Sequence, residues 1–169
     1  MAHFVKISEE NQVLSIMVVA DSDTQNEEGV ETESVGQNFL QTHFSWPAHL
    51  WIKCSYNTFE GKHRNSDTLE FSADQSKAFR LNYASDESLK YDSTLNGFVQ
   101  ANKPHDSWTL NTSTGFYDAP VADPSTMSHN SVLLNPKVWD EDNQRWTALD
   151  SATNINYYWN TETNTWSNI

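Results

Sequence analysis

A short pattern of large apolar and polar residues recurs along the chain and predicts β-hairpins. Each copy has a large apolar residue, then Asp, Asn or Ser, then a polar stretch, and a second large apolar residue seven positions after the first. Asp or Asn just after a strand hydrogen-bonds nearby backbone and starts a turn, so the two apolar residues should face each other across an antiparallel ladder. The copies begin and end at Ile7 and Leu14, Tyr91 and Phe98, Leu110 and Tyr117, Trp139 and Trp146, and Trp159 and Trp166.

Each of these turns needs a residue that tolerates a positive φ angle. Gly97 and Gly115 are the candidates in two copies, and Asn143 and Asn164 in the two C-terminal copies. An isolated hairpin is only marginally stable in water, so several hairpins should pack together or on a partner chain. The copies are irregularly spaced, which argues against a solenoid with a fixed repeat.

Further strands are predicted outside the repeats. Residues 3–20 should form two strands joined by a turn at 8–12, and 51–56 should form another. The stretch 77–84 has the composition of a short strand. Residues 57–76 are polar and are expected to form a loop.

One helix is predicted. Large apolar residues recur at helical spacing over residues 33–44. Thr32 or Ser34 can cap the N-terminus of this helix, and Pro47 limits its C-terminus. The sequence therefore predicts a mainly β fold of antiparallel hairpins, arranged as a meander or small sandwich, with one short helix. An α+β arrangement also fits.

The length and the proline-containing links predict the domain organisation. A chain of 169 residues forms one domain, or one domain with a small appendage. Residues 122–131 are the best linker candidate, so the chain is divided into a β-rich domain at 1–125 and a Trp-hairpin extension at 126–169. The extension is too small to fold alone, and it should dock on the body, on another subunit or on a larger assembly.

Composition and charge narrow the possible partners. Large rings must supply much of the core, because 37% of the residues are hydrophobic and seven are Trp. A net charge of −13 repels phosphate backbones and anionic membranes, so neither nucleic acid nor membrane is expected as a partner. The first residues lack the pattern of a signal peptide, so synthesis in a cytoplasm is expected.

No motif in the sequence points to catalysis. The chain has no nucleophile elbow, no glycine-rich phosphate loop and no His-Glu-x-x-His zinc motif. Cys54 is the single cysteine, so no disulfide is expected. The acidic segment 21–33 resembles the start of a calcium loop, but Asn26 and Thr32 stand where that loop needs Gly and Glu. We therefore expect no enzyme and assign no catalytic residue, cofactor or metal ligand, although the sequence leaves open whether this segment holds a cation.

Tryptophans are the candidate partner-binding residues. Trp is enriched at the centres of protein interfaces, and exposed rings also stack on carbohydrate. The same rings also suit cross-strand pairs and cores, and the sequence does not separate these roles. The candidates are Trp51, Trp108, Trp139, Trp146, Trp159 and Trp166.

Several short motifs in a fixed order carry a family resemblance. They are Met-Ala-His-Phe-Val-Lys-Ile at 1–7, Ser-Tyr-Asn-Thr at 55–58, Arg-x-Asn-Tyr-Ala at 80–84, Lys-Pro-x-x-Ser-Trp-x-Leu-Asn at 103–111 and Ala-Pro-Val at 119–121. Over residues 1–125 this order resembles a family of small, mostly uncharacterised virion-associated proteins of marine cyanophages and related tailed phages. The resemblance implies a virion component and carries over no catalytic residue.

The expected function is therefore that of a phage virion structural protein, made in the host cytoplasm. A capsid decoration or cement protein on the outer shell is the favoured form. Its expected partners are the major capsid protein or other virion proteins, and further copies of itself. The alternatives are a tail, fibre or baseplate component that contacts host glycans, and a host-takeover factor that is absent from the virion.

Overall fold

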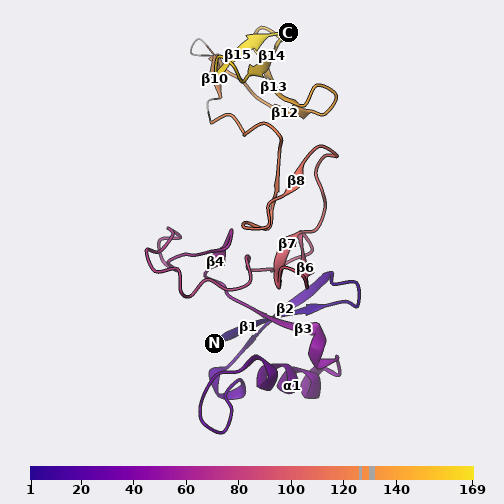
Figure 1. Ribbon diagram of the computed structural model, residues 1–169, viewed down its shortest axis with the longest axis vertical. Helices are drawn as coiled ribbons and strands as arrows, with labels where there is room; N and C mark the ends of the chain where they lie inside the picture. The colour runs from indigo at the N-terminus through magenta and orange to yellow at the C-terminus, as the bar shows by residue number, and fades with distance from the viewer. Residues whose placement is uncertain (126, 130–131) are drawn as a thin grey trace. The chain divides into compact units, whose positions relative to one another are not determined.

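The computed structural model describes residues 1–125, 127–129 and 132–169. These residues form short antiparallel strands in several small sheets and a single α-helix (Figure 1). The predicted mainly β fold with one short helix is confirmed. The chain folds into two compact units, which we call unit 1 (Met1–Asn102 and Leu110–Phe116) and unit 2 (Lys103–Thr109 and Tyr117–Ile169).

The boundaries between the two units differ from the predicted domain boundary at residue 125. Unit 2 includes residues 103–109 and 117–125, which precede the predicted extension. The predicted linker 122–131 lies partly outside the described residues. Its described part contains strand β10 (Ser128–His129), which pairs with β11 (Val132–Leu133).

A three-stranded sheet is the centre of unit 1. Strand β1 (Ala2–Ile7) lies between β2 (Val13–Val19) and β3 (Trp51–Cys54), antiparallel to both. Ile7 pairs with Val13 through a bulge, not with Leu14 as the repeat predicts. The reason is a shorter turn, in which Asn11 takes the positive φ of 64°.

Helix α1 (Glu33–Phe44) has the predicted bounds. It ends at Ser45, which adopts a left-handed φ of 51°, two residues before Pro47. Thr32 occupies the N-cap position, but its side chain makes no capping hydrogen bond. The helix lies close to the sheet at Gly36, where a Cβ atom would be 2.4 Å from Phe4 Cζ.

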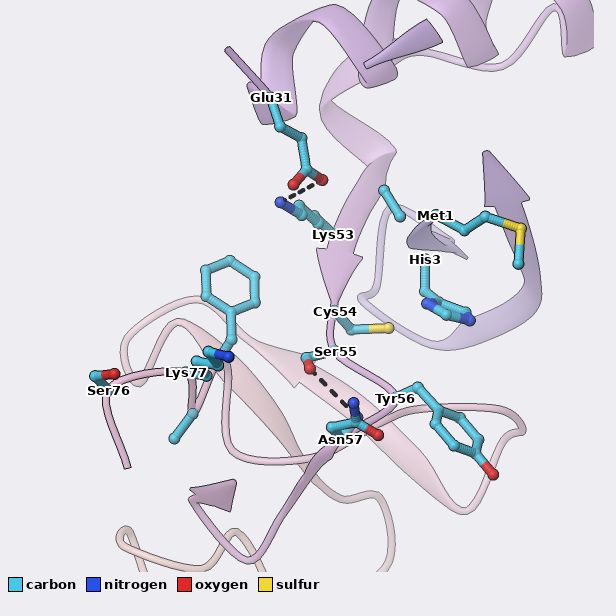
Figure 2. Close-up of a pocket in the computed structure, with 13 residues that line it drawn as sticks. Met1, His3, Glu31, Lys53, Cys54, Ser55, Tyr56, Asn57, Ser76 and Lys77 are labelled. Carbon is cyan, nitrogen blue, oxygen red and sulfur yellow. Dashed lines mark hydrogen bonds and ion pairs between the residues drawn. The ribbon is translucent and has the colours of Figure 1, made fainter. Parts of the chain in front are cut away.

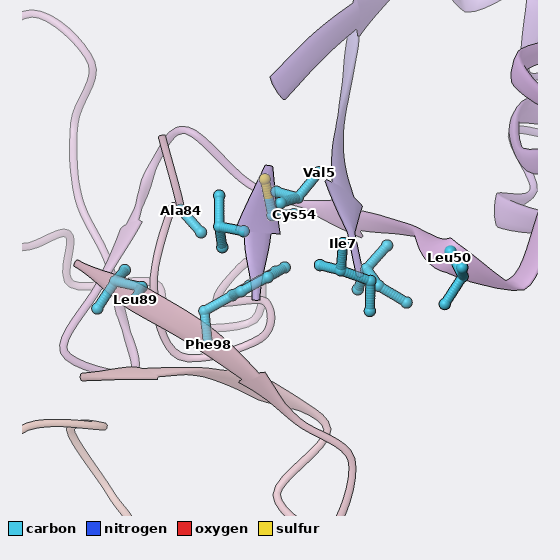
Figure 3. Close-up of a cluster of buried hydrophobic side chains, with 9 residues drawn as sticks. Val5, Ile7, Leu50, Cys54, Ala84, Leu89 and Phe98 are labelled. Atoms are coloured by element: carbon cyan, nitrogen blue, oxygen red, sulfur yellow. The ribbon is translucent and has the colours of Figure 1, made fainter. Parts of the chain in front are cut away.

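Both faces of the unit 1 sheet are covered. One buried cluster lies on the α1 side and contains Ala2, Phe4, Val19, Leu40 and Trp51. A second cluster joins the sheet to the hairpin of β6 (Leu89–Asp92) and β7 (Gly97–Gln100). Figure 3 shows its members, which include Val5, Ile7, Leu50, Cys54, Ala84, Leu89 and Phe98. A small separate hairpin pairs β4 (Thr58–Phe59) with β5 (Lys62–His63).

The strand predicted over 77–84 is not formed. Arg80 and Leu81 adopt positive φ angles of 56° and 60°, which are incompatible with an extended strand. Instead, the Arg80 guanidinium forms a bidentate pair with the Glu33 carboxylate at 2.5 and 2.9 Å. Asn82 is buried, and its side-chain oxygen accepts a hydrogen bond from the Glu60 backbone N–H at 2.8 Å. Hydrogen bonds and an ion pair made by side chains therefore hold this segment in place of backbone hydrogen bonds between strands.

A four-stranded meander is the centre of unit 2. Its strands lie in the order β12 (Lys137–Asp140), β13 (Arg145–Asp150), β14 (Ile155–Asn160) and β15 (Thr165–Asn168). Trp139 pairs directly with Trp146, and Trp159 with Trp166, as predicted. The strands β8 (Thr109–Leu110) and β9 (Tyr117–Asp118) form a further two-stranded hairpin, in which residues 110–116 belong to unit 1.

The hairpin turns that begin with Asp92, Asn111, Asp140, Asp150 and Asn160 share one geometry. An Asp or Asn side chain at the end of the first strand accepts backbone N–H bonds from the turn, as Asp92 does from Thr94 and Leu95. The positive φ falls on the fifth residue after the first apolar position, so Gly97 and Asn143 were wrong choices. The turn between β13 and β14 follows the same rule. In these five turns the residues with positive φ are Asn96, Gly115, Gln144, Asn154 and Asn164.

Candidate functional site

Trp51 is a core residue of unit 1. Its ring is 1% exposed, and its centroid lies 5.7 Å from that of the Phe44 ring. It belongs to the cluster on the α1 side of the sheet. This burial leaves the Trp51 ring no surface for direct contact with a partner.

The other five candidate tryptophans come together in the core of unit 2. Ring centroids lie 5.2 Å apart for Trp139 and Trp146, and 5.4 Å apart for Trp159 and Trp166. Trp108 packs edge-on against Trp146 at 5.9 Å. Trp108 and Trp159 are half-buried, whereas the other three rings are buried. Edge-to-face pairs add roughly 0.5–1.5 kcal/mol each beyond burial, so these rings stabilise unit 2.

A carboxylate joins residues 103–109 to the meander. Glu141 accepts hydrogen bonds from the Ser107 backbone N–H and hydroxyl at 2.7 and 2.8 Å, and from Trp139 Nε1 at 2.7 Å. Burial opposes the charged form of Glu141, but these hydrogen bonds outweigh it and lower its pKa. Sequence analysis missed this residue because Ser107 lies 34 positions away in the chain.

One face of the meander is partly open to solvent. Side chains alternate between the two faces of a sheet, so the buried face of Trp139 and Trp146 has an opposite face. A row of paired residues crosses all four strands on that opposite face. On this face the Val138 side chain is 52% exposed, and the other residues that define the face are half-buried. We define this open face by Val138, Arg145, Thr147, Leu149, Tyr158 and Ser167.

An aromatic ring and a guanidinium meet on the open face. The Arg145 guanidinium carbon lies 4.7 Å from the centroid of the Tyr158 ring. Arg145 Nε also bonds Asp140 at 3.2 Å, which fixes its position. Tyr and Arg are enriched at protein interfaces. The open face therefore has a composition suited to contact with another protein.

Unit 2 also contains a pocket of about 610 Å³. Two indole rings, Trp108 and Trp146, line it together with the continuous segment 117–123. The carboxylates of Asp118 and Asp123 belong to that segment. We call this cavity the indole pocket.

A smaller pocket, of about 400 Å³, lies in unit 1 beside β3 (Figure 2). Lys53 and Glu31 form an ion pair of 2.7 Å there. Burial raises the pKa of the Cys54 thiol to about 12. Burial, with a contribution from the N-terminal amino group, lowers the pKa of His3. Both side chains are therefore uncharged at neutral pH, so Cys54 is not an activated nucleophile.

The acidic segment 21–33 contains a turn that is held by hydrogen bonds to the Asn26 side chain. Asn26 Oδ1 accepts hydrogen bonds from two backbone N–H groups at 3.0 and 2.9 Å. Asp21 pairs with the N-terminal amino group at 2.5 Å, and Glu33 pairs with Arg80. Across the described residues, no group of three or more His, Cys, Asp or Glu side chains is placed to hold a metal ion.

Comparisons of the chain with protein-family models, with curated proteins and with solved structures found no match. In the part of the chain that the structure describes, no helix is long and apolar enough to cross a membrane.

Proposed function

We propose that this chain is a structural protein of a tailed-phage virion, and that unit 2 attaches it to the particle through the open face. The observation that supports attachment is the distribution of side chains on the meander. Its rings fill one face, while Val138, Arg145 and Tyr158 lie on the other. Exposed apolar and aromatic surface next to a fixed guanidinium is typical of protein-binding faces.

The favoured role is capsid decoration, in which the chain binds the outer shell and contacts the major capsid protein. The family resemblance over residues 1–125 supports a virion component. The charge of −13 favours a partner surface that is neutral or basic. The alternatives are a tail, fibre or baseplate location and a role inside the infected cell.

Particle binding by a charge-inserted variant tests the attachment surface. Val138→Asp should lower the amount of chain that sediments with particles by about tenfold, because a carboxylate would be buried in the contact. Val18→Asp is the matched control, since Val18 also lies in a strand and is also 52% exposed. Equal loss in both variants, or none in either, would contradict attachment through the open face.

A further inference from the structure

We propose that the indole pocket of unit 2 binds a neutral sugar unit of a polysaccharide. Its volume of about 610 Å³ lies within the range of roughly 300–1,000 Å³ that is common for small-molecule sites. All of its lining residues belong to unit 2. The proposal goes beyond virion assembly and holds for either location on the particle.

The rings of the pocket suit the C–H face of a pyranose. Trp108 is half-buried, so part of its ring reaches the cavity, and Trp146 and Tyr117 also line it. The Trp108 ring is held edge-on at 5.9 Å from Trp146 and 6.1 Å from Trp139. A ring fixed in this way loses little conformational entropy when a ligand binds.

The polar groups of the pocket suit hydroxyl donors. Asp118 and Asp123 lie in the same lining segment and are both exposed, and Asp123 also pairs with Lys137. A carboxylate can accept hydrogen bonds from two neighbouring hydroxyl groups, and such charge-assisted bonds are stronger than neutral ones. An apolar stacking surface beside carboxylate acceptors matches the two kinds of surface that a sugar presents.

The charges of unit 2 disfavour an anionic ligand. It carries the basic residues Lys103, Lys137 and Arg145. Lys103 Nζ donates to the Asp106 carbonyl oxygen at 2.6 Å, and the other two form ion pairs. A phosphate or uronate would therefore meet carboxylates, with every Lys and Arg in the described part of unit 2 already bound to another group of the chain.

A cationic ligand would compete with a cation of the chain itself. Lys137 Nζ pairs with Asp123 and lies 5.1 Å from the centroid of the Trp146 ring. This ammonium group therefore already pairs with one lining carboxylate and lies over one lining ring, which weakens the attraction of both for a bound cation. With anions repelled and Asp123 already paired, we take a neutral polyhydroxyl ligand as the occupant, and choline in the titration below tests the cationic alternative.

Titration of the full chain tests the proposal, with tryptophan fluorescence as the readout. The neutral probes are cellohexaose, laminarihexaose, mannohexaose and chitohexaose, and polygalacturonate and choline are the charged ones. At least one neutral oligosaccharide should change the emission with saturation, and the charged probes should not. Binding of no neutral probe, or preference for a charged probe, would overturn the proposal.

Two variants locate the site. Asp118→Ala should weaken binding of the neutral probe about tenfold, as expected for loss of a charge-assisted hydrogen bond. Asp142→Ala removes the same charge from an exposed turn outside the pocket and should change the affinity less than twofold. Near-ultraviolet circular dichroism verifies that each variant is folded. Equal effects of the two substitutions would place the sugar elsewhere. Because no particle is needed, this result is independent of the virion assignment.

Discussion

Unit 1 and unit 2 bury their cores with different side chains. The cluster between the sheet and the β6–β7 hairpin of unit 1 is largely aliphatic, with Val5, Ile7 and Leu50 among its members. The cluster of unit 2 consists mainly of aromatic rings. The aliphatic cluster joins strands from distant parts of the chain, whereas Trp139 pairs with Trp146 and Trp159 with Trp166 within single hairpins. Unit 2 shows how short hairpins acquire a common core when large rings are available.

The two units also differ in the contacts that join distant segments of the chain within each of them. In unit 1, helix α1 covers one face of the sheet, and the Arg80–Glu33 pair links residues 47 positions apart. In unit 2, segment 103–109 is joined to the meander by hydrogen bonds from Ser107 to the Glu141 carboxylate. Small hairpin sheets need such additional cover, because the meander alone leaves both of its faces exposed.

The largest expected effect comes from removing a ring. Trp166 is 2% exposed, and Trp166→Ala should lower the free energy of unfolding of unit 2 by about 3–5 kcal/mol. Phe98→Ala should act with similar size on unit 1. Hydrogen exchange followed by mass spectrometry should show lost protection only in the unit that carries the substitution. Lost protection throughout both units in either variant would mean that they unfold as one.

A substitution at the closest approach of helix and sheet tests unit 1. Gly36→Ala should destabilise unit 1 by about 1–3 kcal/mol, because the new Cβ atom would clash with the Phe4 ring. Asn38→Ala, at an exposed position of the same helix, should be neutral or slightly stabilising. Urea unfolding followed by circular dichroism measures both. A stabilising Gly36→Ala would contradict the close packing of α1.

Acid should weaken unit 2 through Glu141. The folded state lowers the pKa of Glu141 below its ordinary value of 4.5, so its contribution is present above that pH. The contribution is lost as the pH falls through the lowered value. Thermal unfolding of unit 2 between pH 7 and pH 3 should show a smaller pH dependence in Glu141→Gln than in the parent. Glu162→Gln, in an exposed turn, should leave the pH dependence unchanged.

The smallest effect concerns turn geometry. Gln144 has a φ of 47°, a conformation that glycine adopts without strain. Gln144→Gly should therefore raise the free energy of unfolding of unit 2 by about 0.5–1 kcal/mol. Asn143→Gly, at the position that the sequence suggested, should give no gain. A larger gain from Asn143→Gly would contradict the shared turn geometry.

Local patterns predicted local structure well. The helix over 33–44 and the Trp139–Trp146 and Trp159–Trp166 pairs follow from periodicity and turn residues, which act over a few positions. The pattern failed over 77–84, where a buried Asn82 and the Arg80–Glu33 pair hold the backbone in a non-strand conformation. Such contacts join distant residues and leave no periodic signal.

The candidate sites were predictable only in part. The sequence singled out the tryptophans, but periodicity assigns a residue to a face without showing what covers that face. The indole pocket depends on the packing of Trp108 and Trp146 against segment 117–123, which no local pattern encodes. The open face likewise became visible only when the register placed Val138 and Tyr158 in one row.

The proposed virion role requires that mature particles contain this chain. Quantitative mass spectrometry of gradient-purified particles measures this, by counting this chain against the major capsid protein. A decoration protein should be present in copies on the order of hundreds per particle, as symmetric decoration of a shell requires. A few copies, in multiples of about three or six, would indicate the tail instead. Absence of the chain from purified particles would contradict the proposed virion role.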